Sequence, residues 1–184
     1  MLIDPTKFTN YDLDDIGLEN YVLFVIAVAG KNAITTARNL HGLIGESKPF
    51  KFINKVDHLA DKMKSQGFGC YNLKAKGFKY IARANLDLKT CTREDLVACP
   101  GIGMKSASFF ILHTRRDQKI ACLDTHILKW LKRRGHDVPK ASPQSVKKYL
   151  KIEELFLQIA EEKNMAPATL DLQIWNEESG HLTI

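Results

Sequence analysis

The chain has 184 residues, and 45% of them are apolar, which is enough to bury a core in one compact unit or in two small lobes. The net charge of +6 at pH 7 favours a polyanionic partner, and the four cysteines have neither the spacing of a zinc ribbon nor that of a disulfide framework. The apolar run 21–29 is too short to span a bilayer, and no secretory signal pattern is present. We therefore expect an intracellular protein of the cytoplasm or nucleoid, with no membrane contact.

Apolar positions recur at helical spacing along the chain, and no segment alternates as a half-buried strand does. Gly67 and Gly69 interrupt the pattern, and Pro143 and Pro167 fall where helices can begin. The sequence therefore predicts an all-α fold. The expected helices, in chain order, are 20–29, 31–44, 50–65, 72–84, 94–99, one from Met104, one from Thr125, one from Gln144, 152–163 and 166–178.

A Pro-Gly-Ile-Gly turn joins the helix over 94–99 to the one that begins at Met104. The proline stops the first helix, and two glycines one residue apart permit positive φ and a close approach of the backbone to a ligand. The first amide N–H groups of the second helix then lie free beside the glycines, where a phosphate meets N–H donors and the positive end of a helix dipole. Such a site holds a nucleic acid by its backbone, whereas the plain alternative is a tight link between packed helices. The residues of this predicted phosphate site are Pro100, Gly101, Ile102 and Gly103.

Two residues that follow the turn, Lys105 and Asp124, are candidate reactive groups. Lys105 lies in the first turn of the second helix, where the dipole disfavours the ammonium form and favours an amine that can attack carbon. Asp124 precedes an amphipathic helix, as an N-cap does. A solvated surface charge is the alternative for Lys105, and capping alone is the alternative for Asp124. His126 is interpreted as structural and no metal site is expected, since the six histidines have no metal-ligand spacing.

The stretch from Leu96 to Ala107, with Lys105 and Asp124 in register, resembles the helix-hairpin-helix of the HhH-GPD superfamily of base-excision DNA glycosylases. In that family the lysine displaces a damaged base from its sugar and forms a Schiff base that permits β-elimination. The family's aspartate stabilises the positive charge that develops on the sugar. The resemblance therefore implies that Lys105 and Asp124 are catalytic residues of a bifunctional DNA N-glycosylase and AP lyase.

The same resemblance implies an all-α, two-lobed fold with duplex DNA in the cleft between the lobes. One expected lobe is a helical barrel of residues 20–117, with the helix-hairpin-helix over about 94–115. The other is built from both chain ends, residues 1–19 and 118–184. Endonuclease III carries a four-cysteine iron–sulfur cluster after its catalytic aspartate, but no cysteine follows Cys122 here. We therefore expect no cofactor, apart from a monovalent cation that the hairpin could hold.

The segment that starts at Leu170 is similar to the closing helix of the small 8-oxoguanine DNA glycosylase/lyases, which are mostly of archaeal or thermostable type. Asp171 and Trp175 are four residues apart on one helical face, where a carboxylate and an indole could read and stack a flipped base. Core packing is the alternative for Trp175. In one group of these enzymes a C-terminal lysine reads the base, whereas this sequence ends in 181–184, His-Leu-Thr-Ile, so the base identity stays open. Three further residues, Gly30, Lys31 and Asn32, resemble that group's turn at the DNA face.

We predict a monomeric base-excision repair enzyme that binds double-stranded DNA and removes 8-oxoguanine through a Schiff base on Lys105. One alternative is an oxidised-pyrimidine glycosylase/lyase of the endonuclease III type, which would use the same two residues on another base. The other is a non-catalytic helix-hairpin-helix protein that only binds DNA. Basic residues form two groups, for each of which a solvated helix face is the default interpretation: Lys74, Lys76, Lys79 and Arg83, and then Lys129, Lys132, Arg133, Arg134, His136 and Lys140.

Overall fold

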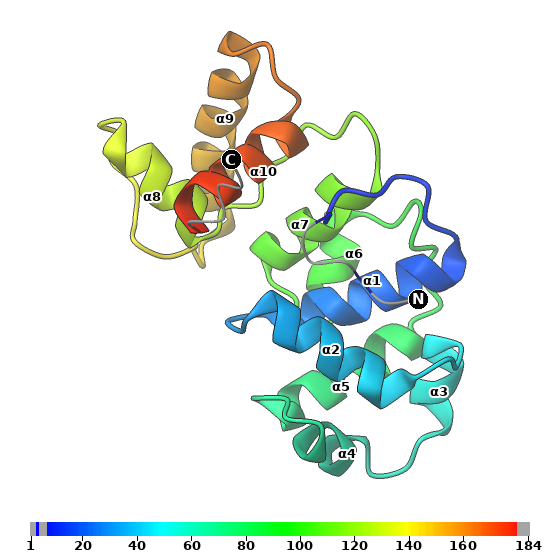
Figure 1. The fold of residues 1–184 in the computed structure, drawn as a ribbon. Coiled ribbons are helices and arrows are strands. Elements are labelled where there is room, and N and C mark those ends of the chain that lie inside the picture. Colours follow the sequence, from blue (N-terminus) through cyan, green and yellow to red (C-terminus); the bar gives the residue numbers. More distant parts are fainter. Residues whose placement is uncertain (1–2, 4–6, 180–184) are drawn as a thin grey trace.

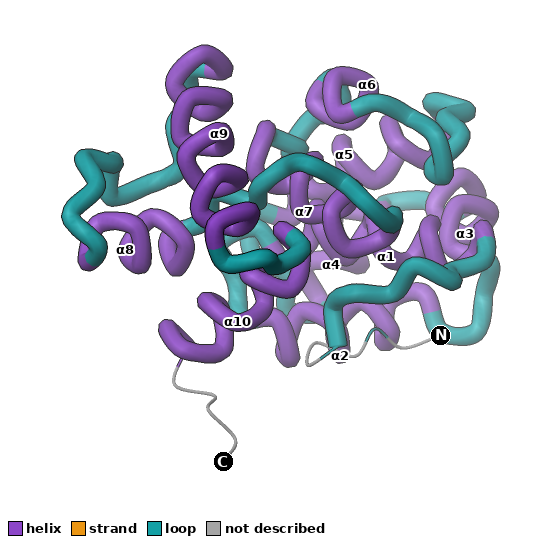
Figure 2. The backbone as a smooth tube through the Cα atoms, turned by 90° about the horizontal axis from the view of Figure 1, so that it is seen from above, coloured by secondary structure: helices purple, strands orange, loops and turns teal. Residues whose placement is uncertain are grey.

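The structure is a computed structural model that describes Ile3 and residues 7–179. Within these residues the chain folds into helices joined by turns and loops, with no strand, so the all-α prediction is confirmed (Figures 1 and 2). None of the helices in this part of the chain is long and apolar enough to cross a membrane. The helices are α1 (Asp15–Val28), α2 (Ala33–Ile44), α3 (Pro49–Lys55), α4 (Leu59–Ser65), α5 (Tyr71–Arg83), α6 (Arg93–Val97), α7 (Met104–Thr114), α8 (Thr125–Arg133), α9 (Val146–Glu162) and α10 (Pro167–Ser179).

The single helix predicted over 50–65 is wrong, because the chain forms α3 and α4 instead. It leaves α3 at Val56, which is extended with a ψ of 128°, and turns through His58, whose φ is 50°. Val56 is buried, and its carbonyl accepts a hydrogen bond from Lys79 Nζ of α5 at 2.7 Å. A contact with a distant helix thus replaces the hydrogen bond that would continue α3. Conversely, the two helices predicted near Gln144 and over 152–163 are one helix, α9.

Two groups of helices surround two hydrophobic clusters. α1 is central to the first, since residues 22–27 are at most 1% exposed and α2, α3, α5 and α7 pack around it. The second cluster lies among α8, α9 and α10 and includes Trp130, Tyr149 and Phe156. α10 contacts α7 as well as α8 and α9, so it lies where the two groups meet (Figure 1).

The N-terminal segment contacts both groups of helices. The Phe8 ring lies 6.1 Å from that of Phe24 and 5.3 Å from that of Phe109, both in the first group. It also lies 5.7 Å from the Trp175 ring of α10. These contacts do not test a domain boundary, so the two lobes expected from the sequence stay a prediction.

A buried ion pair joins the two groups. Arg93 Nη1, at the start of α6, lies 2.7 Å from Glu153 Oε2 of α9, and the two side chains are 14% and 7% exposed. The same carboxylate oxygen accepts a hydrogen bond from Ala121 N at 2.8 Å. Arg93 Nη1 also donates to Ser108 Oγ of α7 at 3.2 Å. Because these partners compensate each other in the interior, removal of one leaves a buried charge without its counterpart.

Replacing Glu153 with alanine is expected to lower the free energy of unfolding by about 3–5 kcal/mol, because the Arg93 guanidinium then loses its buried partner. Urea unfolding followed by circular dichroism measures this change. The matched control is Asp12→Ala, which removes the exposed partner of Arg116, 3.1 Å away. This control is expected to change the free energy of unfolding by less than about 1 kcal/mol. Equal losses in the two variants would contradict the importance of burial.

Candidate active site

The hairpin consists of α6, a turn over 98–103, and α7. Thr92 caps α6 through a capping box, in which its Oγ1 accepts a hydrogen bond from Asp95 N at 3.1 Å and its own N donates to Asp95 Oδ2 at 2.8 Å. The Thr92 amide, and the Thr92 hydroxyl that also donates to Asp95 Oδ2, hold the pKa of the Asp95 carboxyl below its usual value. The turn is closed by Ile102 N, which donates to Cys99 O at 3.0 Å. The Ile102 side chain is buried, so it packs into the core beneath the turn.

Two glycines allow the hairpin to pack closely on α5. Gly101 has a φ of 89°, in the left-handed region that favours glycine. Gly77 lies in the middle of α5, and a Cβ placed on it would be 2.4 Å from the backbone oxygen of Pro100. Burial raises the pKa of Cys99, whose Sγ donates to Gly77 O, to about 11. Sequence reasoning missed Gly77, although a glycine inside a helical pattern is a known sign of close packing.

The N-terminus of α7 is open to a ligand. Gly103 is its N-cap, and no side chain of the described residues caps the helix. A Cβ placed on Gly103 would have no heavy atom within 4 Å, beyond its chain neighbours. The first amide N–H groups of α7 therefore have no side-chain cap, and the space beside Gly103 is open, as the predicted phosphate site requires. Lys105 is the second residue of this helix and is half-buried.

Asp124 is the N-cap of the next helix, α8, as Gly103 is the N-cap of α7. Its Oδ1 accepts hydrogen bonds from His126 N at 2.8 Å and from Ile127 N at 2.9 Å, so it caps α8. These bonds use Oδ1, which leaves Oδ2 for a second role. Lys105 and Asp124 thus both lie at the positive end of a helix dipole.

α9 fixes the extended segment that leads to Asp124. The Tyr149 hydroxyl donates to Ala121 O at 2.7 Å and accepts from Leu123 N at 3.1 Å. Burial raises the pKa of Tyr149, so the phenol stays protonated and can donate. Glu153, one turn further along α9, holds the other side of Ala121 through its amide. Sequence reasoning missed both residues, and the available signal was a glutamate on the apolar face of α9.

The charges around Lys105 and Asp124 act on one another. Burial raises the pKa of the Asp124 carboxyl, and the negative charge of Asp171 raises it further. The positive charge of Lys105 lowers this pKa and that of the Cys122 thiol, so the amine lies within electrostatic range of both groups. Burial nevertheless dominates at Cys122 and raises its pKa well above the usual value. The structure therefore brings Lys105, Asp124 and Asp171 together from α7, α8 and α10.

Asp171 is buried with only one of its two carboxylate oxygens bonded. Its Oδ2 lies 3.2 Å from His113 Nε2, and His113 Nδ1 lies 2.8 Å from Thr9 Oγ1. Its Oδ1 is buried and has no hydrogen-bond partner among the described residues. A buried acceptor without a donor is uncommon in a native fold and indicates a strained or functional position. Sequence reasoning missed His113, which lies fully buried among the apolar residues of α7.

Trp175 lies one turn beyond Asp171 on α10 and is half-buried. Its ring packs edge-on against Phe8, with an interplanar angle of 89°, and lies 6.3 Å from the ring of His126. His126 follows Asp124 by two residues, so the indole is close to the start of α8. These contacts are compatible with both interpretations of Trp175, core packing and base stacking.

The predicted DNA-face turn of Gly30, Lys31 and Asn32 is the exposed link between α1 and α2. Gly30 has a φ of 67°, and the Asn32 side chain caps α2. The Lys31 side chain lies against the turn between α4 and α5, and Lys74 Nζ of α5 donates to Ala27 O at the end of α1. The contacts of the described residues thus connect this turn to the turn between α4 and α5, and not to the lysine–aspartate pair.

Two sequence expectations about ligands are not settled by these residues. No group of three His, Cys, Asp or Glu side chains in the described part of the chain could hold a metal ion, and the four cysteines are free thiols. The expected lack of a cofactor nevertheless stays a prediction. The C-terminal residues that left the base identity open, 181–184, lie outside the described residues.

The hairpin, the lysine on its second helix and the aspartate cap of the next helix place this protein in the helix-hairpin-helix class. A family model described as 8-oxoguanine DNA glycosylase, Ogg-HhH, matches residues 20–165. The chain belongs to this family, which confirms the resemblance found in the sequence.

Relatives of known name agree with this family. The chain is 30% identical over 191 residues to an 8-oxoguanine DNA glycosylase/AP lyase of Saccharolobus solfataricus, with 96% of this chain and 89% of the relative covered. It is 40% identical over 87 residues to a Thermotoga sp. (strain RQ2) protein of the same name. That match covers 46% of this chain and only 41% of the Thermotoga relative.

Solved structures share the fold over nearly the whole chain. The crystal structure of the 8-oxoguanine DNA glycosylase of Thermotoga maritima matches with a TM-score of 0.78 at 27% identity, covering 95% of this chain and 86% of that one. A Methanocaldococcus jannaschii 8-oxoguanine glycosylase/lyase, in complex with a 15mer DNA containing 8-oxoguanine, matches with a TM-score of 0.76 at 27% identity and the same coverage. These likenesses confirm the predicted HhH-GPD fold class.

Replacing Asp124 with asparagine is expected to make the protein more stable at neutral pH and less active. The pKa of Asp124 is raised in the folded state, so the protonated carboxyl favours the folded protein. This contribution to stability is fully present below the pKa of the unfolded chain, about 3.9, and is lost as pH rises through the pKa of the folded protein. Asparagine keeps a capping oxygen and has no such loss. The melting temperature of the variant minus that of the wild type should therefore increase from about pH 4 upward. A difference that does not change with pH would contradict the raised pKa.

Proposed function

We propose that this protein is a base-excision repair DNA glycosylase with AP lyase activity, which removes 8-oxoguanine from duplex DNA. The observation that carries the proposal is the placing of Lys105 and Asp124 at the N-termini of α7 and α8, where the amine acts electrostatically on a carboxyl of raised pKa. The family match and the names of the relatives support the choice of base and of partner.

The proposed reaction begins when Lys105 gives up a proton and its nitrogen attacks C1′ of the damaged nucleotide. The glycosidic bond breaks, and the base leaves with the bonding electrons and takes up a proton. The sugar ring then opens to a protonated Schiff base between the lysine nitrogen and C1′. Loss of a proton from C2′ expels the 3′ phosphate oxygen and cuts the strand, and water hydrolyses the Schiff base.

Asp124 is proposed to move protons in these steps. A carboxyl whose pKa is raised by burial accepts a proton more readily than an ordinary aspartate, so it can receive the proton that Lys105 gives up. Once charged, it stabilises positive charge on the sugar and on the Schiff base. Its capping bonds to α8 hold it in place for both roles.

Pro100, Gly101, Ile102 and Gly103 are proposed to hold a backbone phosphate of the same DNA. The open amides of α7 supply the donors, and the helix dipole favours the negative charge. Because a phosphate contact carries no base information, this grip serves an enzyme that meets damage in any sequence. A monovalent cation at the hairpin stays a prediction. The Schiff-base route needs only a lysine and a carboxylate, so we propose no resident cofactor. We also propose that the protein acts as a monomer.

Asp171 and Trp175 are proposed to form the pocket of the flipped base. The unpartnered Oδ1 of Asp171 can accept a hydrogen bond from a ring N–H of the base, and 8-oxoguanine has an N7–H that guanine lacks. The Trp175 indole can stack on the ring. Gly30, Lys31 and Asn32 are proposed to contact the DNA from the other side and to offset a few kcal/mol of unstacking.

Lys105→Gln is expected to abolish a covalent adduct that the wild-type protein forms on a duplex with 8-oxoguanine opposite cytosine in the presence of borohydride. Borohydride reduces a Schiff base to a stable amine, which gel electrophoresis detects. Binding of the same duplex should persist in the variant, because the hairpin phosphate site is intact. If the wild-type protein forms no adduct on this duplex or on an abasic duplex, and Lys105→Gln merely weakens binding, the result would favour a non-catalytic DNA-binding protein. An adduct on the abasic duplex and on thymine glycol, but not on 8-oxoguanine, would favour an oxidised-pyrimidine enzyme.

Asp171→Asn is expected to slow the release of 8-oxoguanine by roughly 10- to 100-fold, because a hydrogen bond to a charged acceptor contributes about 1.5–3 kcal/mol. Strand cleavage at a preformed abasic site, which has no base to read, should change far less. Single-turnover assays on the two duplexes measure both rates. An equal loss on both substrates would show that Asp171 acts on the reaction or on folding instead of on the base.

A further inference from the structure

The basic group that precedes the hairpin has no role in the proposed reaction, but all of its members except the buried Lys74 line a groove beside the hairpin. This groove, of about 670 Å³, lies between α5 and α6. Lys76, Lys79 and Arg83 of α5 line it together with the exposed ring of Tyr80. Ala98 and Pro100 of the hairpin turn are also part of its wall. The groove therefore starts where the proposed phosphate site ends.

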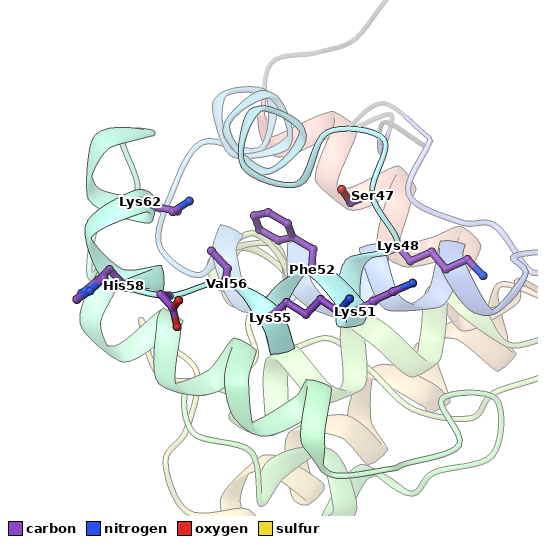
Figure 3. Close-up of a pocket in the computed structure, with 9 residues that line it drawn as sticks. Ser47, Lys48, Lys51, Phe52, Lys55, Val56, His58 and Lys62 are labelled. Carbon is purple, nitrogen blue, oxygen red and sulfur yellow. The ribbon is translucent and has the colours of Figure 1, made fainter.

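A second basic groove, of about 730 Å³, lies at α3 and α4. Figure 3 shows the Phe52 ring between lysine side chains of the two helices. The groove also contains the imidazole of His58 and one acidic side chain, that of Asp57. Its lysines are Lys48, Lys51, Lys55 and Lys62.

The two grooves adjoin each other along the seam of α3 and α5. Lys79, which lines the first groove, donates its Nζ hydrogen bond to the carbonyl of Val56, which lines the second. Asn54 Nδ2 of α3 likewise donates to Ala82 O of α5 at 3.0 Å. Each helix adds roughly 10 Å between its first and last lining cation, at 1.5 Å per residue. Together the grooves make a basic track that runs from the hairpin along the outer side of α5 and α3.

The cations of the track are exposed, except for the half-buried Lys79, and none of them is paired with a carboxylate among the described residues. In the described part of the chain, the ion pairs of lysine and arginine involve Lys89, Arg93, Arg116, Lys129 and Arg133, and none involves a track residue. Asp57 and Asp95 are the acidic residues that line the two grooves. The positive charge is spread along a path instead of converging on one point, so it suits a linear polyanion better than a single phosphate ion.

We propose that the basic track binds the phosphate backbone of the duplex that flanks the lesion, on the side where the strand leaves the hairpin. The inference rests on the proposed function for its polyanion, and it adds a binding site outside the base pocket and the lysine–aspartate pair. DNA carries one charge per 1.7 Å or so of its axis, so a flank of one helical turn presents phosphates along the whole track. Pro100 makes the track continuous with the hairpin site.

The test compares three duplexes that contain 8-oxoguanine: a core of about one helical turn, and the same core extended by about one turn on the 5′ side or on the 3′ side of the lesion. The track variant carries Lys51→Gln, Lys55→Gln, Lys76→Gln and Arg83→Gln, all at exposed positions. The control variant carries Lys147→Gln, Lys148→Gln, Lys151→Gln and Lys163→Gln, four exposed lysines of α9 and its C-cap, in the other group of helices (Figure 1). Both variants lose the same net charge.

Wild-type protein is expected to bind one of the two extended duplexes more tightly than the core, by fluorescence anisotropy, and the other no more tightly. The track variant should lose this gain. The slope of its salt dependence on that duplex should fall by roughly 0.9 for each phosphate that it no longer neutralises, and so by about 3.6 for the four cations removed. The control variant should keep the gain. A charge-retaining variant with Lys51→Arg, Lys55→Arg and Lys76→Arg should also keep it.

No gain for either extension in the wild type would overturn the proposal, as would a gain that survives in the track variant. A loss of the same size in the control variant would also overturn it, because net charge alone would then explain the result. Binding of the extended duplexes does not require catalysis. A length-dependent gain without borohydride trapping would therefore leave the track standing and reject the proposed reaction.

Discussion

The geometry of the proposed active site depends on hydrogen bonds that α9 makes to a segment without regular secondary structure. Lys105 belongs to the group of helices around α1, whereas Asp124 belongs to the group of α8, α9 and α10. Tyr149 and Glu153 hold the segment that leads to Asp124, and Arg93 ties Glu153 back to the hairpin. A buried ion pair is a weak source of stability, because desolvation offsets its attraction. Here the ion pair of Arg93 and Glu153 lies where it determines the relative positions of the Lys105 amine and the Asp124 carboxyl.

Opposing electrostatic effects meet at Asp124. Burial and the charge of Asp171 favour the protonated carboxyl, whereas the capping amide of Ile127 and the charge of Lys105 favour the carboxylate. A group on which such effects compete changes protonation with a small change in its surroundings, and that is the property a proton carrier requires. The departure of a base or the loss of the lysine proton would supply such a change. The helix dipoles of α7 and α8 keep the field at both residues positive throughout.

The sequence predicted features that depend on local residue types. Pro100 and Gly101 determine a turn by their own backbone preferences, and Asp124 caps a helix that begins at the next residue. The break between α3 and α4 was not predicted, because it depends on Lys79, which reaches Val56 from 23 positions away. The network of Glu153 was missed for the same reason, since the amide it binds lies 32 positions earlier in the chain. Periodicity shows which face of a helix is buried but not which partner covers it.

The order of these parts along the chain has a consequence for synthesis. The hairpin and Lys105 lie in the first two thirds of the sequence, whereas the residues that hold and complete the site, Glu153 and Asp171, come from the last two helices. A nascent chain that has emerged only as far as α8 already contains the hairpin and both reactive groups, yet it lacks Tyr149 and Glu153, which hold the segment that leads to Asp124. Under the proposed function, such a chain has the hairpin that holds DNA before its lysine and aspartate are positioned to cut it. The proposed chemistry therefore requires that α9 and α10 have been translated and have folded against α8.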